Sequence, residues 1–197
     1  SRVYSENNKL IAEYAIEKRL FIPYDSIPEN LINSFLSAED KNFFSHPGID
    51  AKGILRAIIN NIKNIAQNKR LEGASTITQQ VAKNFLLTNE VSIKRKIKEA
   101  ILAFRIERAL NKERILELYL NQIYLGSGAY GVAAASLEYF DKSIKELNYA
   151  EAALLAALPK APSRYNPYNN IDLAKFRRDL VLKNLNQNGF LNVEKYN

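Results

Sequence analysis

The chain is organised around residues 39–48, which read Glu39-Asp40-Lys41-Asn42-Phe43-Phe44-Ser45-His46-Pro47-Gly48. The residues before this stretch predict a helix that ends at position 39, because apolar side chains recur at helical spacing from position 31 to position 36. Glu39 falls on the same apolar face, whereas Asp40 is projected away from it. Desolvation raises the pKa of a carboxyl group, so Glu39 is a candidate general base near neutral pH. The alternative is that Glu39 only caps or pairs at the helix end.

The composition is that of a globular protein. The chain has 197 residues, of which 47% are hydrophobic and 25% charged, enough for one core or two unequal lobes. Its net charge of +7 favours anionic partners: phosphate, nucleic acid or an acidic membrane surface. There is no cysteine and a single histidine, which excludes disulfides, thiol catalysis and a multi-histidine metal site. No run of about 20 apolar residues is present, so we expect no membrane span in this sequence.

Residues 49–65 predict an amphipathic helix. Its apolar face consists mainly of isoleucines, and its other face carries Lys52, Arg56 and Lys63. Such a helix can lie in a membrane interface, and the alternative is an ordinary helix that faces the core. Strand signals are scarce along the whole chain, so the sequence predicts a mainly α fold, preceded by an extended arm or small hairpin.

Within residues 73–84, three hydroxyl side chains and two glutamines stand at the start of a helix behind a glycine. The first turn of a helix offers free backbone N–H groups and a positive dipole end, which suit phosphate or sugar. The alternative is that Ser75 or Thr76 only caps the helix. The candidate binding residues here are Ser75, Thr76, Gln79, Gln80, Lys83 and Asn84.

Residues 91–109 form the longest helical pattern and carry apolar residues on both sides, which predicts a central buried helix. Glu99 has Arg95 and Lys96 one turn before it. These cations either keep the carboxylate ionised or clamp a substrate phosphate. The alternative is an ordinary ladder of ion pairs along the helix. A later helix, over residues 173–188, is expected to point Arg177 and Arg178 outward.

Five blocks of residues, taken together and in order, resemble the glycosyltransferase domain of bifunctional class A penicillin-binding proteins. The resemblance covers about residues 25–170. The blocks are Glu39-Asp40-x-x-Phe43-x-x-His46-x-Gly48, Gly73-Ala74-Ser75-Thr76-Ile77-Thr78-Gln79-Gln80-x-x-Lys83-Asn84, Arg95-Lys96-x-x-Glu99, Arg114-Ile115-Leu116-Glu117-x-Tyr119-Leu120-Asn121 and Ala150-Glu151-Ala152-Ala153-Leu154-Leu155-Ala156-Ala157-Leu158-Pro159. The resemblance implies one domain over residues 1–197, with a lysozyme-like helical lobe and a smaller membrane-facing jaw lobe. Residues 1–24 would be an N-terminal arm, and about residues 49–72 the jaw.

The activity that this resemblance implies is polymerisation of lipid II into glycan strands, with inversion and release of undecaprenyl pyrophosphate. Glu39 matches the catalytic base, and Glu99 matches a second carboxylate that assists the leaving pyrophosphate directly or through a divalent metal, Mg or Mn. No organic cofactor is implied. The matched binding residues are the cations Lys83, Arg95 and Lys96, the cleft residues Ser75, Thr76, Gln79, Gln80 and Asn84, and Asp40, Phe43 and His46 of the first block.

The implied partners are lipid II, the growing lipid-linked strand and a membrane surface, with no nucleic acid. The implied location is the outer face of the cytoplasmic membrane in the bacterial envelope, with an anchor outside this sequence. Members of this family often carry a transpeptidase domain in the same chain, and its Ser-x-x-Lys and Lys-Thr-Gly motifs do not occur here. Two rival functions stay open: a lysozyme-like muramidase or lytic transglycosylase, and a non-catalytic membrane-binding module.

Overall fold

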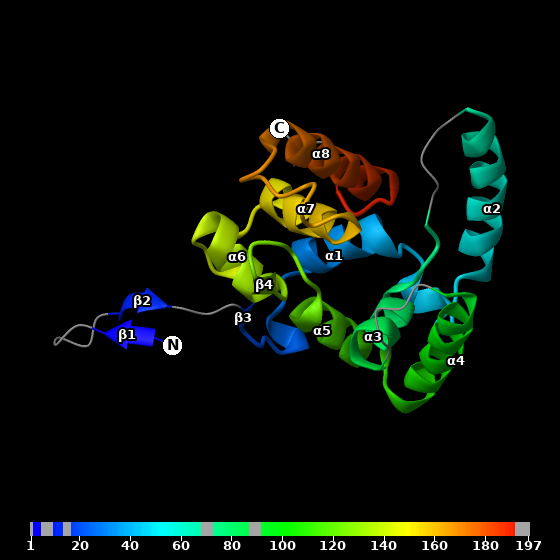
Figure 1. The fold of residues 1–197 in the computed structure, drawn as a ribbon, viewed down its shortest axis with the longest axis horizontal. Helices are drawn as coiled ribbons and strands as arrows, with labels where there is room; N and C mark the ends of the chain where they lie inside the picture. The colour runs from blue at the N-terminus through cyan, green and yellow to red at the C-terminus, as the bar shows by residue number, and fades with distance from the viewer. Residues whose placement is uncertain (1, 5–9, 14–16, 68–72, 87–91, 192–197) are drawn as a thin grey trace.

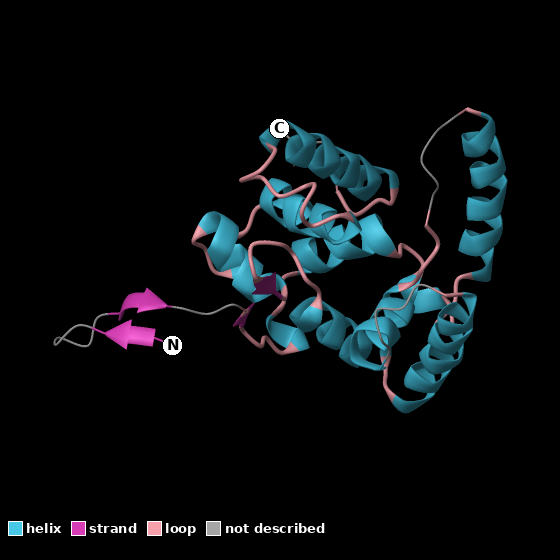
Figure 2. Cartoon of the chain, viewed as in Figure 1, coloured by secondary structure: helices cyan, strands magenta, loops and turns pink. Residues whose placement is uncertain are grey.

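Helices make up most of the chain in the computed structural model, which describes residues 2–4, 10–13, 17–67, 73–86 and 92–191 (Figure 1, Figure 2). The predicted mainly α fold is confirmed. The helices are α1 Glu29–Glu39, α2 Ala51–Ala66, α3 Ile77–Leu86, α4 Ile93–Ala109, α5 Lys112–Gln122, α6 Val132–Phe140, α7 Tyr149–Ala157 and α8 Ile171–Gln187. The strands are β1 Arg2–Tyr4, β2 Leu10–Glu13, β3 Lys18–Arg19 and β4 Ala129–Tyr130.

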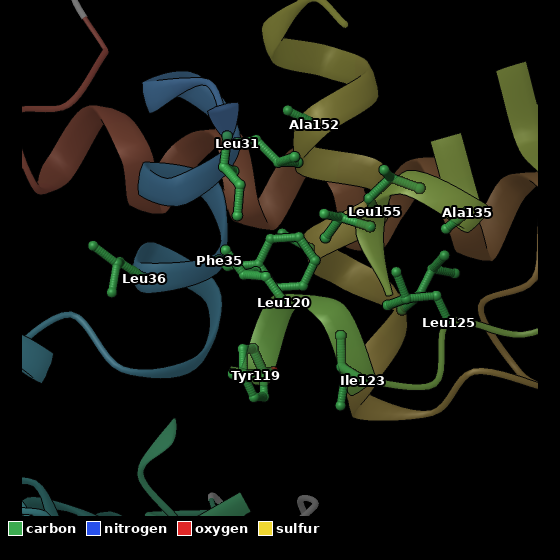
Figure 3. Packing of buried hydrophobic residues seen from close by; sticks show 14 of the residues in the cluster. Leu31, Phe35, Leu36, Tyr119, Leu120, Ile123, Leu125, Ala135, Ala152 and Leu155 are labelled. Carbon is green, nitrogen blue, oxygen red and sulfur yellow. The ribbon is translucent and has the colours of Figure 1, made fainter. Parts of the chain in front are cut away.

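The larger lobe is built around α1, which packs against α7 and α8. Phe35 of α1 and Tyr119 of α5 are fully buried or nearly so, and their rings meet edge to face with centroids 6.1 Å apart (Figure 3). The small alanines of α7 let the neighbouring helices approach closely, while leucines such as Leu155 fill the space between them (Figure 3). This core holds the last turn of α1, and therefore Glu39, in a fixed position.

The smaller lobe consists of α2, α3 and α4. Helix α3 packs on both α4 and α5, which connects the two lobes. Helix α2 stands at the edge of the molecule, and α4 lies at the same end (Figure 1). Gly53 and Ala57 are the buried residues of α2, whose isoleucine face is exposed.

The prediction that residues 91–109 form a central buried helix was wrong. Helix α4 lies at the edge of the smaller lobe, and its apolar residues Ile93, Ile97, Ile101 and Phe104 are exposed, Ile93 by 82%. Its buried residues are Glu99 and Ala103. An apolar pattern shows that a face avoids water, but it does not tell whether protein or another apolar medium covers that face.

The N-terminal arm contains a hairpin, as the sequence predicted, in which β1 and β2 pair antiparallel. Strand β3 then pairs in parallel with β4, and Lys18 forms an ion pair with Glu138 of α6, so the end of the arm is tied to the larger lobe. Residues 1, 5–9 and 14–16 of the predicted arm and residues 68–72 of the predicted jaw lie outside the described residues. Val91, the first residue of the predicted helix over 91–109, lies outside them too.

Candidate active site

Glu39 ends α1 and is partly buried. The Nε2 atom of Gln80, on α3, donates a hydrogen bond of 2.8 Å to Oε2 of Glu39. Burial raises the pKa of the Glu39 carboxyl above its ordinary value, and the Gln80 hydrogen bond and the charges of Arg177 and Lys160 offset part of that rise. Glu39 is thus a carboxylate whose proton affinity is increased, as expected of a general base that works near neutral pH.

Asp40 differs from its predicted orientation, because it is buried rather than turned away from the protein. It follows the last helical residue with φ −160° and ψ 76°, so the helical projection no longer applies to it. Both of its carboxylate oxygens lie 3.0 Å from Nε2 of His46, and Oδ2 also accepts the N–H of Ile77 at 3.0 Å. Asp40 therefore connects the end of α1 to the start of α3.

His46 holds the loop between α1 and α2 in shape. Its Nδ1 accepts the N–H of Gly48 at 3.2 Å, which leaves the proton on Nε2 to be donated to Asp40. Gly48 has φ +94°, and a Cβ on it would lie 3.1 Å from the backbone of Ala103 on α4. Phe43 is fully buried beside this loop. Neither Phe43 nor His46 lines the three cavities of the cleft described below.

Three of the N–H groups at the start of α3, where the sequence predicted free N–H groups, already have partners in the structure. The N–H of Thr76 donates to Oε1 of Gln79 at 3.0 Å, the N–H of Ile77 is taken by Asp40, and the N–H of Gln79 donates to Oγ1 of Thr76 at 3.2 Å. The hydroxyl of Thr76 in turn donates to the carbonyl oxygen of Gly48 at 2.6 Å. Thr76 and Gln79 are buried and hold this turn in place.

Glu99 is only 2% exposed and lies between two cations. Nζ of Lys96 donates to Oε2 of Glu99 at 2.6 Å and to the hydroxyl of Ser75 at 2.8 Å, while Nη1 of Arg95 lies 3.6 Å from Oε1 of Glu99. Among the described residues, Oε1 of Glu99 and Nε of Arg95 are buried without a hydrogen-bond partner. An ordinary ladder of ion pairs on a helix surface would leave its carboxylate exposed. Because Glu99 is buried, the cluster resembles an anion-binding site more than an ion pair that only stabilises the helix.

Two adjoining cavities meet at Glu39. The first, of about 380 Å³, lies between the end of α1, the start of α2, residues 73–76 and α8. The second, of about 340 Å³, is lined by α3, α4 and the segment after α7. The residues that line both are Ala38, Glu39, Gly73, Ser75, Lys160 and Arg177. The second cavity also contains Gln79, Gln80, Lys83, Arg95, Lys96 and Glu99. Asn84 lines a third cavity, which shares Gln80, Lys83 and Pro159 with the second.

Sequence reasoning missed two cations that face Glu39. Arg177 was expected to point outward, but it lines both cavities, because α8 packs against α1 and turns this face toward the cleft. Its guanidinium lies 6.0 Å from the ring centroid of Tyr165. Lys160 follows Pro159, the last residue of the fifth block, so one more position would have included it.

The described residues do not form a metal site from protein ligands alone. No group of three or more acidic, histidine or cysteine side chains comes together in the part of the chain that the structure describes. Glu99 is a single carboxylate that already carries two cationic neighbours, which disfavour a dication. The divalent metal therefore stays a prediction.

A partly buried carboxylate between two cavities whose linings include several lysines and arginines is typical of acid/base enzymes that act on anionic substrates. A profile of the transglycosylase family matches residues 7–186, and the chain belongs to this family. Penicillin-binding protein 1A of Rickettsia felis is 59% identical to the chain over 191 residues, which cover 97% of this chain and 24% of that protein. The corresponding protein of Aquifex aeolicus is 52% identical over 196 residues, covering 100% of the chain and 27% of its own length.

A solved structure, penicillin-binding protein 1A from Haemophilus influenzae, has a TM-score of 0.56 and 27% identity and covers 99% of this chain and 19% of that one. These similarities confirm the resemblance to the glycosyltransferase domain of class A penicillin-binding proteins. The chain is a peptidoglycan transglycosylase domain. It spans about a quarter of the length of these curated relatives.

Proposed function

We propose that this domain polymerises lipid II into glycan strands by an inverting displacement that releases undecaprenyl pyrophosphate. The observation that carries the proposal is the position of Glu39 on the boundary of two cavities, with Lys83, Arg95 and Lys96 gathered in the second. A transferase that joins two sugars needs one base between two sugar sites, and a leaving pyrophosphate needs fixed positive charge.

In this proposal the donor lies in the second cavity and the acceptor in the first. Glu39 takes the proton of the acceptor 4-hydroxyl while its oxygen attacks the anomeric carbon of the donor. The new C–O bond forms as the bond from that carbon to the pyrophosphate oxygen breaks, and the electron pair leaves with the pyrophosphate. Lys83, Arg95 and Lys96 stabilise the developing charge, and Glu99 keeps the last two in position.

The cluster of Lys83, Arg95 and Lys96 argues against a glycan-cleaving function. A lysozyme-like muramidase or lytic transglycosylase cleaves a neutral glycosidic bond and needs no cluster of positive charge for its leaving group. A non-catalytic membrane-binding module would not need a partly buried carboxylate of raised pKa between two cavities.

The deciding experiment offers the protein lipid II and, separately, finished uncrosslinked glycan, each with Mg²⁺ and with a chelator. We expect strands to form from lipid II and no cutting of the glycan. Cutting of glycan without extension of lipid II would overturn the proposal in favour of the muramidase, and activity that is equal in chelator would reject the predicted metal.

The pH dependence of polymerisation should report the environment of Glu39. The base must be ionised, so activity falls as the pH drops through its pKa. The Gln80 hydrogen bond favours the ionised form, and Gln80→Leu should therefore raise that pKa and move the acidic limb of the rate profile to higher pH. The measurement is the initial rate across the pH range, with Gln67→Leu at the exposed C-cap of α2 as control. An acidic limb that stays in place would contradict the assigned contact.

We further propose that α2 and α4 place the domain on a membrane surface. Exposed apolar residues follow one face of α2 at helical spacing, Leu55, Ile58, Ile59, Ile62 and Ile65, and α4 exposes four more. Among the described residues no helix is long and apolar enough to cross a membrane. Both helices also carry several lysines and arginines, which favour anionic lipid. The jaw lobe would thus include α4 in addition to the predicted residues 49–72.

Replacing Ile58 and Ile62 by serine should weaken binding to anionic liposomes by about thirtyfold, because each side chain loses a contribution of about 1 kcal/mol from partial burial in lipid. Both residues are exposed, Ile62 by 67%, so the melting temperature should not change. Sedimentation with liposomes measures the binding. The matched control replaces Ile171 and Phe176 of α8, which are equally apolar and exposed. Equal liposome binding by the two double variants would mean that the isoleucine face of α2 does not contact the membrane.

The remaining parts of the proposal concern the whole protein. The length of the relatives favours a parent chain with a further domain, for which a transpeptidase is our expectation. We propose that the protein lies in the bacterial envelope, on the outer face of the cytoplasmic membrane, where it can reach a lipid-linked donor from the membrane interface. We propose no role for nucleic acid.

A further inference from the structure

A fourth cavity, of about 540 Å³, lies between the loop that follows α1 and the C-terminal end of α4. The loop contributes residues 44–47, α4 contributes Phe104, Glu107 and Arg108, and α5 contributes Lys112. Among the described residues, the fourth cavity shares none with the linings of the three cavities in the cleft. The proposed reaction therefore does not use it.

Two exposed phenylalanines line the fourth cavity. Phe44 is 52% exposed and Phe104 is 43% exposed. The ring of Phe44 meets the buried ring of Phe43 edge to face, with centroids 5.2 Å apart, which holds Phe44 at the surface. Phe104 lies three residues after Ile101 and belongs to the exposed apolar face of α4. The cavity is thus continuous with the face of α4 that we propose lies on a membrane.

Arg108 adds a positive charge at the end of this apolar face, because it lies four residues after Phe104 on the same side of α4. It is exposed, and among the described residues no ion pair or hydrogen bond engages its guanidinium. The other charged residues of the cavity are engaged with each other, since Nζ of Lys112 donates to Oε1 of Glu107 at 2.7 Å. Arg108 is therefore available to an anion.

The base of the fourth cavity is held in place without a ligand. Oε1 of Glu107 also accepts the hydroxyl of Thr78 on α3 at 2.6 Å. Nζ of Lys112 donates to the carbonyl oxygen of His46 at 2.7 Å and lies 4.4 Å from the ring centroid of Phe43. The side chains of Lys112 and Glu107 are only 18% and 10% exposed. A cavity that is already formed loses little conformational freedom when it binds a ligand.

We infer that the fourth cavity binds the headgroup of an anionic phospholipid, with the phosphate on Arg108 and the first part of the acyl chains beside Phe44 and Phe104. The inference rests on the proposed function, in which this face of α4 lies on a membrane. A phospholipid combines the two chemistries that the cavity offers, because its phosphate is next to hydrocarbon. A small soluble anion would gain nothing from two exposed rings. The site would make membrane attachment depend on the class of lipid as well as on apolar area.

The test uses dihexanoyl phosphatidylglycerol below its micelle concentration, so that the protein meets single lipid molecules and no membrane surface. In a titration followed by nuclear magnetic resonance, Arg108→Gln should weaken binding about tenfold, equivalent to about 1.4 kcal/mol. The matched control is Arg105→Gln, which removes the same charge from an exposed residue of α4 that lines none of the four cavities. It should bind as the wild type does.

A second comparison replaces the lipid instead of the protein. Dihexanoyl phosphatidylcholine has no net charge, and the wild type should bind it about tenfold more weakly than the glycerol lipid. Equal binding of the two lipids, or equal binding of the glycerol lipid by Arg108→Gln and Arg105→Gln, would overturn the fourth cavity as a site for anionic lipid. Arg108 is exposed and unpaired among the described residues, so its replacement should leave the melting temperature unchanged.

The same lipid separates this inference from the proposed function. The double variant of Ile58 and Ile62 should lose liposome binding but still bind the single lipid, because neither residue lines the fourth cavity. Binding of the single lipid that depends on Arg108, in a protein that does not bind liposomes, would overturn only the proposed membrane face. The titration does not measure polymerisation, so failure to extend lipid II would overturn the proposed reaction and not the lipid site.

Discussion

Replacing Glu39 by glutamine should lower the initial rate of lipid II polymerisation about 1,000-fold, the size of effect typical for loss of a general base. The amide has almost the same shape and can still accept the hydrogen bond that Gln80 donates at 2.8 Å, so the cleft keeps its geometry. What disappears is the group that accepts the proton of the attacking hydroxyl. The measurement is the rate of strand formation from labelled lipid II.

The matched control is Glu29→Gln, which makes the same change at the exposed other end of α1 and should leave the rate unchanged. The melting temperature gives a second readout. Burial raises the pKa of Glu39, so its charge destabilises the fold above that pKa, and Glu39→Gln should melt at a higher temperature than the wild type at neutral pH. The difference should shrink as the pH falls and the wild-type carboxyl takes up a proton. Rates within threefold of wild type would mean that Glu39 is not the base.

Asp40→Ala should have the largest effect on stability, lowering the free energy of unfolding by about 3 kcal/mol. The change leaves the buried N–H of Ile77 and the Nε2–H of His46 without their acceptor, since both lie 3.0 Å from Asp40. The substitution also removes the contact between the end of α1 and the start of α3. The hydrogen bond between Glu39 and Gln80 depends on that contact, because the two residues lie on these two helices. We therefore expect polymerisation to fall by about tenfold or more even where the variant is folded.

Urea unfolding followed by circular dichroism measures the stability. Asp50→Ala is the control: Asp50 caps α2 by accepting the N–H of Gly53 at 2.9 Å but is only partly buried, so its loss should cost about 1 kcal/mol. Asp40→Asn keeps one acceptor oxygen and should fall between the wild type and Asp40→Ala. If Asp40→Ala is as stable as Asp50→Ala, the buried junction of α1 and α3 contributes less than its geometry indicates.

Much of the site could be predicted because its residues lie close together in sequence. Helical spacing predicted that Glu39 lies on the apolar side of α1. It also predicted that Glu99 shares one face of α4 with Lys96, three residues before it, and with Arg95, four residues before it. The pairing of Asp40 with Ile77 spans 37 residues, and nothing in the local sequence of either residue indicates it. The same holds for Arg177, which is far from the five blocks and reaches Glu39 only because α8 packs on α1.

The helical class, the two carboxylates and the cations beside one of them could be predicted from the amino-acid pattern, because periodicity and short spacing establish which side chains share a face. The tertiary structure then establishes what each face contacts. In the structure Asp40 is buried where α1 ends, and its carboxylate accepts the N–H of Ile77 at the start of α3. The apolar side of α4 is exposed. The packing also brings Phe44, from the loop after α1, into one cavity with Phe104 and Arg108 of α4. A sequence pattern indicates whether a helix face is polar or apolar. Which surface that face contacts depends on how the helices pack.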